Sequence, residues 1–255
     1  MEGFAVLLRK ELREAWRTSR LLVAGTVFLV FGILSPLLAK YMPELIRLLG
    51  TPGGMAISLP APVIGDAVDQ FLKNLGTAAF VVILLAMGVV AREKERGTAA
   101  FVLAKPAGRL AFLAAKFAAL ALLCAGGLAL GGAAMYGYTA YYFAPLPVGG
   151  FLAGCALLLL ALLVYAAVTF LGSTLTDSTP VAAGVGIGAY LALALIGAIP
   201  RVAPYTPGGL FAPARALALG ESPGGLAASL LANLALVGLA LAASWLAFRR
   251  QELGG

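Results

Sequence analysis

The sequence predicts an all-α polytopic membrane protein, with six transmembrane helices, an N-terminal amphipathic interfacial helix and both termini in the cytoplasm. Three observations predict this fold. First, 62% of the 255 residues are hydrophobic and only 11% are charged, whereas a soluble domain carries roughly 25% charged residues. Second, the charges are separated by apolar runs of about 20 residues, the length that crosses a ~30 Å hydrocarbon core. Third, lysine and arginine are concentrated on alternate connecting segments, as they are on the cytoplasmic side of membrane proteins.

The N-terminal segment, residues 1–20, has an apolar side and a basic side at helical spacing. The apolar side holds Phe4, Leu7, Leu8, Leu12, Ala15 and Trp16, and the basic side holds Arg9, Lys10, Arg13, Arg17 and Arg20. This pattern is typical of a helix that lies in the inner membrane interface. Glu11 interrupts the apolar side. Pairing with a base from a neighbouring loop and exposure at the edge of the apolar stripe explain it equally well.

Six apolar runs follow and define a transmembrane domain over residues 21–248, which leaves a cytoplasmic tail over 249–255. The spans are expected near 21–39, 74–91, 117–139, 151–175, 180–199 and 224–248. The third and fourth come from one charge-free run, 117–176, which the prolines and glycines of 136–150 divide. The spans are helices rather than open strands, because backbone polar groups in lipid must pair within their own segment.

Two of the predicted outer segments have patterns of their own. In residues 66–75, Val68, Phe71, Leu72 and Leu75 recur at helical spacing with charges opposite. This predicts a lateral helix on the outer surface. Residues 200–223 carry five prolines and remain apolar between them, which predicts short interfacial or re-entrant helices. Ser222 and Pro223 are expected to begin the sixth span.

The basic residues orient the chain. With the N-terminus in the cytoplasm, the inner segments carry 13 of the 18 lysines and arginines and the outer segments carry five. The positive-inside rule therefore predicts cytoplasmic termini. The same asymmetry explains the net charge of +7, so nucleic acid is not expected as a partner.

Several classes of active site lack the residues that they need. The chain has no histidine, which excludes Ser-His-Asp and Cys-His catalysis and histidine-ligated metal sites. An intramembrane enzyme built on Ser222 would therefore have no histidine base. No G-x-x-x-x-G-K-[ST] motif is present, so any ATP hydrolysis would belong to a partner. No catalytic residue, metal ligand or cofactor of this chain is predicted.

The small and polar residues inside the spans are better explained by helix packing than by a catalytic or transport role. The pairs Gly127–Gly131 and Gly184–Gly188 predict surfaces for close helix packing. The candidates for a polar substrate path are few and are Thr26, Ser35, Thr169 and Asn233. For Asn233, an interhelical hydrogen bond is favoured over a substrate contact.

The most charged stretch, residues 92–109, holds seven charged side chains in 18 residues. Gly97 is expected to end the preceding helix, Thr98 to cap a short apolar helix over 99–104, and Pro106 to end it. An ordinary basic inner loop would explain the lysines and arginines but not the two glutamates. A docking surface for a soluble partner explains both, and its predicted residues are Glu93, Glu95, Gly97, Thr98, Phe101, Val102, Leu103 and Pro106.

Four of these positions, together with Lys116, carry a resemblance to a known family. Glu95, Gly97, Thr98, Pro106 and Lys116 resemble the acidic residue, Gly-Thr pair, proline and lysine that surround the loop after the second span in ABC-2 type permeases, the membrane subunits of one class of ABC transporter. The N-terminal helix, the six spans and the longer outer segment before the last span resemble this family too.

The resemblance implies a permease of an ATP-driven exporter in the plasma (inner) membrane of a prokaryote. Its partners would be a soluble ABC ATPase subunit, which binds ATP and Mg, a second permease copy or paralogue, and membrane lipid. The 92–116 loop would contain the coupling helix that contacts the ATPase. The alternative is a non-transporting membrane scaffold or assembly factor, which the glycine-rich helices and basic inner face would also suit.

Overall fold

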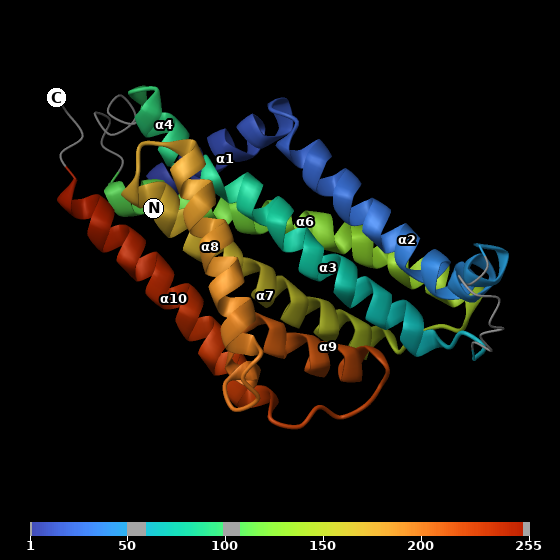
Figure 1. Ribbon diagram of the computed structural model, residues 1–255. Helices are drawn as coiled ribbons and strands as arrows, with labels where there is room; N and C mark the ends of the chain where they lie inside the picture. The colour runs from blue at the N-terminus through green and yellow to red at the C-terminus, as the bar shows by residue number, and fades with distance from the viewer. Residues whose placement is uncertain (1, 50–59, 99–107, 252–255) are drawn as a thin grey trace.

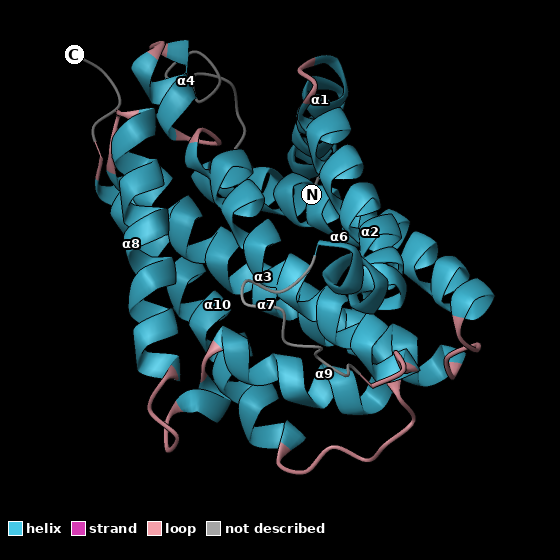
Figure 2. Ribbon diagram, turned by 45° about the vertical axis from the view of Figure 1, so that its right-hand side comes forward, coloured by secondary structure: helices cyan, strands magenta, loops and turns pink. Residues whose placement is uncertain are grey.

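The computed structural model describes residues 2–49, 60–98 and 108–251, which form helices joined by turns (Figures 1 and 2). Six of these helices are long and apolar enough to cross a membrane, which confirms the predicted all-α class and six spans. They are α2 (Arg20–Leu49), α3 (Ile64–Met87), α6 (Arg109–Tyr142), α7 (Val148–Leu175), α8 (Thr179–Gly197) and α10 (Leu226–Arg250). The shorter elements are α1 (Glu2–Arg17), α4 (Ala91–Glu95), η1 (Ala203–Tyr205), η2 (Pro207–Leu210) and α9 (Phe211–Ala218).

Helix α7 is the centre of the bundle. It contacts α3, α6, α8, α9 and α10, and its sequence is apolar on all sides and free of charge. A helix that is hydrophobic all round is stable only when other apolar groups surround it. The other spans therefore arrange themselves around α7, and α2 is added on the outer side of α3 and α6 (Figure 1).

Glycine allows α2 and α6 to approach closely. A Cβ atom added at Gly131 would overlap the carbonyl oxygen of Phe28, and one at Gly127 would lie 2.9 Å from the Phe28 ring. The predicted packing role of this glycine pair is therefore confirmed. The role predicted for Gly184 and Gly188 is not, since a Cβ at either would meet no atom within 4 Å. In α8 it is Gly186 that packs closely, against Thr169 and Ile83.

The predicted lateral helix over 66–75 is wrong, because α3 runs without a break from Ile64 to Met87. The four apolar residues of this segment are all buried in the core of the bundle, namely Val68, Phe71, Leu72 and Leu75. The segment therefore continues straight into the second span. Asp66 stabilises the start of α3 by accepting a hydrogen bond of 2.8 Å from the Val63 amide.

Short helices do occupy residues 203–218, as predicted. Helix α9 lies against the first turns of α7, where Gly154 leaves room for the Ala214 carbonyl and Gly150 for that of Leu217. The last span then begins at Leu226 after Gly225, which has a φ of +69°. Ser222 and Pro223 therefore do not begin it, because the left-handed residue that turns the chain into the helix lies two or more positions later.

Helix α1 crosses the start of α6, at the end of the bundle where α4 also lies (Figure 1). Arg109 of α6 donates to the carbonyls of Arg249, in the last turn of α10, and of Gln251, which follows it, so both ends of the described chain lie at this end. It is called the junction end below. Ala15 and Glu11 of α1 are buried, and Val6 and Trp16 are exposed. The interfacial position of α1 and the cytoplasmic side of the junction end stay predictions.

Candidate functional site

The charged stretch that the sequence singled out begins with α4, a single helical turn. Helix α3 ends at Met87, and the chain turns through 88–90 before α4 begins at Ala91. The amides of Val90 and Ala91 donate to Oγ of Ser173 in α7, at 3.1 and 2.9 Å. Since the first amides of a helix have no partner within it, the Ser173 hydroxyl stabilises the start of α4. It also fastens that start to α7.

Lys94 and Glu95 fasten α4 to the turn between α7 and α8. Lys94 Nζ lies 3.1 Å from the carbonyl oxygen of Thr174 and 2.6 Å from Oδ1 of Asp177. A cation beside the last carbonyls of α7 is favourable because the carbonyl end of a helix carries partial negative charge. Glu95 Oε2 accepts a hydrogen bond of 3.0 Å from the hydroxyl of Thr179, the first residue of α8.

Glu93 fastens the opposite side of α4 to α1 and α6. Its Oε1 lies 2.9 Å from Nζ of Lys10 and 3.0 Å from Nζ of Lys116, and Lys116 also lies 3.0 Å from Oε1 of Glu11. The side chains of Lys116 and Glu11 are only 2% and 8% exposed. Of the two readings of Glu11 that the sequence left open, the structure therefore shows pairing, with the lysine that opens the third span.

Charge complementarity holds this cluster together. Burial by itself lowers the pKa of Lys10, but the hydrogen bond to Glu93 and its charge outweigh that effect, so the pKa is raised from its ordinary value. Carboxylate oxygens of Glu11, Glu14 and Glu93 lie within 4.8 Å of one another. Because Lys10 and Lys116 supply the positive charge between them, we interpret the cluster as an ion-pair network rather than a cation site.

Together these contacts define the α4 junction: α4, Ser173 and the residues bonded to Lys94, Glu95 and Glu93. Through it one short helix is attached to α1, α6, α7 and α8. A displacement of α4 would therefore act on these four helices through their contacts with it.

The remaining predicted docking residues divide into two groups. Gly97 has a φ of +67° and directly follows the last residue of α4's cap, and the Thr98 hydroxyl donates to the Glu93 carbonyl at 3.1 Å. The helix break at Gly97 is thus confirmed. The Thr98 hydroxyl satisfies a carbonyl near the C-terminal end of α4. Phe101, Val102, Leu103 and Pro106 lie outside the described residues, and their roles stay predictions.

The four residues predicted for a substrate path are not joined to one another by any hydrogen bond in the described part of the chain. Ser35 donates to the Phe31 carbonyl and accepts a hydrogen bond from Asn74 of α3 at 2.9 Å, and Thr169 donates to the Tyr165 carbonyl at 2.8 Å. Thr26 is exposed.

Asn233 is fully buried in α10. Its Nδ2 donates to the carbonyls of Ser229 and Thr206, at 2.8 and 3.3 Å. The contact with Thr206 joins α10 to the turn between η1 and η2, so the bond is a structural one, but it reaches a turn and not, as predicted, another helix. The sequence could not find that partner, because a backbone carbonyl in an irregular segment leaves no pattern.

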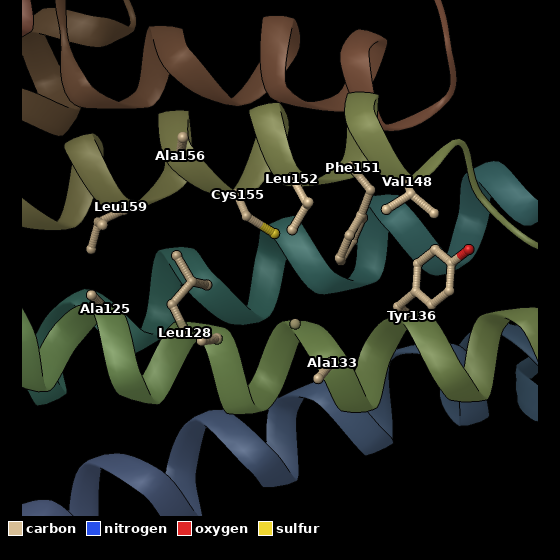
Figure 3. A pocket seen from close by; sticks show the side chains of 12 residues that line it. Ala125, Leu128, Ala133, Tyr136, Val148, Phe151, Leu152, Cys155, Ala156 and Leu159 are labelled. Atoms are coloured by element: carbon tan, nitrogen blue, oxygen red, sulfur yellow. The ribbon is translucent and has the colours of Figure 1, made fainter.

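An apolar cavity of about 520 Å³ lies between α6 and α7 (Figure 3). None of the four predicted path residues lines it. Its lining is apolar apart from the Cys155 thiol and the Tyr136 hydroxyl, which is already bonded to the Leu146 carbonyl at 3.2 Å. The cavity thus has few polar groups that could recognise a ligand, whereas the α4 junction holds five of the six ion pairs among the described residues.

Comparison with known proteins identifies the family of this chain. The model of the family described as "ABC-2 family transporter protein" matches residues 5–253. The chain belongs to the ABC-2 transporter family. A relative, the uncharacterized transmembrane protein YxlG of Bacillus subtilis (strain 168), is 27% identical over 210 residues, which cover 81% of each chain. As an ABC-2 family member the chain is a multi-pass membrane component of a transporter, and the resemblance seen at Glu95, Gly97, Thr98, Pro106 and Lys116 is confirmed at the level of the family.

Proposed function

We propose that this chain is the permease subunit of an ATP-driven exporter, coupled to a separate ATP-binding subunit through residues 92–116. The α4 junction is the observation that carries the proposal. Helix α4 leads directly into the predicted docking residues, and it is bonded on one side to α7 and α8 and on the other to α1 and α6. Force applied by a partner at this loop would therefore move helix ends instead of bending a free loop.

The two sides of the junction have different strengths. On the α1–α6 side, Glu93 of α4 meets Lys116 with side chains only 15% and 2% exposed, and breaking a buried ion pair by removing one partner costs about 3–5 kcal/mol. The Asp177 carboxylate that meets Lys94 is 74% exposed, and exposed ion pairs contribute about 0–1 kcal/mol. The α1–α6 side is thus the firmer attachment, and the α7–α8 side is the one that could open during a transport cycle.

In this proposal the partner subunit binds ATP and Mg, and its cleft receives Phe101, Val102 and Leu103, with Glu95, Gly97 and Thr98 as the stem and Pro106 closing the loop. The chain would lie in the plasma membrane of a prokaryote, with the junction end in the cytoplasm. Apolar anchors dominate most interfaces, while charges at the rim align the partners. Glu93 would not be such a rim charge, because Lys10 and Lys116 already hold its Oε1.

A second permease copy is part of the proposal. Only 11% of the apolar stretch of α8 is buried. A Cβ atom added at Gly184 or Gly188 would meet no atom within 4 Å. A small-xxx-small surface in a membrane helix suits close approach of another helix. Disulfide cross-linking of a Gly188→Cys variant between two copies in membranes supports α8 as this contact. Cross-linking no stronger than that of Gly137→Cys in α6 contradicts it.

The coupling proposal is tested by co-purification and by nucleotide hydrolysis. The proposal predicts that an ATP-binding subunit encoded by a neighbouring gene co-purifies with this chain and hydrolyses ATP faster in the complex. Phe101→Asp and Leu103→Asp should abolish both effects. Leu48→Asp, an exposed leucine at the far end of α2, is the matched control and should abolish neither. If the Asp variants in the loop retain binding and stimulation, the loop does not couple the subunits.

A second variant separates docking from transmission. Lys94→Met leaves the predicted docking residues intact but removes the bonds from α4 to the Thr174 carbonyl and Asp177. It should therefore bind the ATP-binding subunit normally and fail to transport. Transport at the wild-type rate by Lys94→Met would show that the α7 attachment does not transmit the motion.

A further inference from the structure

Another cavity lies at the junction end, and its lining is rich in basic side chains, as in an anion-binding site. It has a volume of about 420 Å³ and lies where α1, the start of α2, the turn after α3 and the start of α6 meet. Two acidic side chains line it, Glu14 and Glu93. Five basic side chains line it, namely Lys10, Arg20, Arg92, Arg96 and Lys116. The walls therefore carry three positive charges in excess.

The excess lies with the arginines. Lys10 and Lys116 are paired with glutamates, as described above. Within the described residues, no carboxylate oxygen comes within 4.0 Å of the guanidinium groups of Arg20, Arg92 or Arg96. The charge of Arg92 opposes that of Arg20, while the charges of Glu14, Glu11 and Glu93 support it. Because the basic side chains that line the cavity still outnumber the acidic ones by three, the cavity favours binding of an anion.

The cavity is shaped to hold a guanidinium group in place. A Cβ atom at Gly88 would lie 3.3 Å from Nε of Arg92 and 3.4 Å from its Nη2. The absence of a side chain at Gly88 thus leaves room for the Arg92 guanidinium beside the end of α3. A planar guanidinium presents paired donors that match the oxygens of a phosphate group.

One carboxylate oxygen of Glu93, whose side chain is part of the cavity lining, lacks a hydrogen-bond donor. Oε2 of Glu93 is buried and has no hydrogen-bond partner, whereas Oε1 is bonded to both lysines. A buried polar atom without a partner costs free energy. A ligand that carries both a phosphate and a hydroxyl would satisfy the arginines and this oxygen together.

The position of the cavity favours a lipid as the source of that phosphate. Arg20 begins the span α2, and Arg92 lies in α4, directly after the turn that ends the span α3, so both lie beside the end of a span, where the head groups of a bilayer begin. Trp16 and Val6 of α1 are exposed, and exposed tryptophan beside a span is typical of the membrane interface. Basic pockets between transmembrane helices bind anionic head groups in other membrane proteins.

We propose that this cavity binds the head group of an anionic glycerophospholipid of the phosphatidylglycerol type. Arg20, Arg92 and Arg96 hold the phosphodiester oxygens, and Oε2 of Glu93 accepts a hydrogen bond from a head-group hydroxyl. The bound lipid joins the start of α2, at Arg20, to α4 and its C-cap, at Arg92, Glu93 and Arg96, and so adds to the α4 junction. This assignment does not depend on coupling to an ATP-binding subunit.

The test is a titration of the full-length chain in dodecyl maltoside micelles, followed by native mass spectrometry. Dioleoyl phosphatidylglycerol should bind at least about tenfold more tightly than dioleoyl phosphatidylcholine. Arg92→Gln and Arg20→Gln should each weaken phosphatidylglycerol binding by about tenfold, the loss expected for one charge-assisted hydrogen bond. Arg13→Gln removes an exposed arginine of α1 that does not line the cavity and should bind as the wild type does.

Further arms identify the occupant. Dioleoyl phosphatidylmethanol has the same charge but no head-group hydroxyl, so it should bind several-fold more weakly. Equal binding of the two anionic lipids would overturn the role given to Glu93. Inorganic phosphate at the same concentration should not displace the lipid. If it does, or if an acidic peptide does, the cavity is a site for a soluble anion or for a protein segment. Equal effects of Arg13→Gln and Arg92→Gln would reduce the binding to general surface charge.

Discussion

Lys116 is the residue at which the structure makes its sharpest quantitative prediction. Its ammonium group lies 3.0 Å from a carboxylate oxygen of Glu11 and 3.0 Å from one of Glu93, and its side chain is 2% exposed. In Lys116→Met, Glu93 keeps Lys10, but Glu11 is left buried with only the longer 3.4 Å contact to Lys10. Removing one partner of a buried ion pair costs about 3–5 kcal/mol.

This cost is measurable as a shift in thermal stability. For a chain of about 250 residues, 1 kcal/mol corresponds to roughly 2–4 °C in the unfolding midpoint. Lys116→Met in detergent should therefore unfold at a midpoint roughly 6–20 °C below that of the wild type. Circular dichroism during heating measures this midpoint. The matched control is Lys73→Met, which removes an exposed lysine of α3 that forms no ion pair with a described residue.

A double variant separates the buried charge from lost packing. Glu11→Leu combined with Lys116→Met removes both members of the pair and leaves Lys10 with Glu93. Because replacing a whole buried ion pair by apolar residues is often neutral or stabilising, the double variant should regain most of the lost stability. If Lys116→Met is no less stable than Lys73→Met, or if the double variant is as unstable as the single one, the reasoning about this ion pair is refuted.

Three further variants test other contacts. Gly131→Val should disrupt α2–α6 packing and reduce the yield of folded protein, because its Cβ would overlap the Phe28 carbonyl, whereas Gly137→Val, with open space around it, should be tolerated. Ser173→Ala removes the acceptor for the Val90 and Ala91 amides. We expect the free energy of unfolding to fall by about 1–3 kcal/mol and hydrogen exchange at those two amides to become faster. Ser222→Ala is the control and should change neither. Asp69→Asn should cost less than about 1 kcal/mol despite the 2.6 Å contact with Arg215, because both side chains are 39% exposed, and a loss above 2 kcal/mol in chemical unfolding would contradict this.

The sequence predicted the spans well and the role of the segment before the second span poorly. Hydropathy marks a span because the hydrocarbon core accepts only apolar, internally bonded segments. In residues 66–75, however, the same helical spacing of Val68, Phe71, Leu72 and Leu75 suits either a membrane surface or a protein core. Only the neighbouring helices decide between them, and here all four are buried.

The glycines of α8 show the same limit. Gly184, Gly186 and Gly188 alternate along one helix, and a small-xxx-small pattern fits the first and last of them. The structure packs Gly186 against Thr169 and leaves the other two clear of the chain. The pattern gives the spacing of a close contact but does not give the partner, because the direction in which a helix presents its faces depends on what surrounds it.

By itself the sequence determined that this is a six-span helical membrane protein of the ABC-2 kind, since composition, span length and the residues around Gly97 are properties of local segments. The tertiary structure alone decided which charges meet. Glu11 and Lys116 are 105 residues apart, and Glu93 reaches Lys10 across 83. Such pairs depend on how three helix ends are brought together. Coulomb attraction acts on distance in space, which no spacing along the chain encodes.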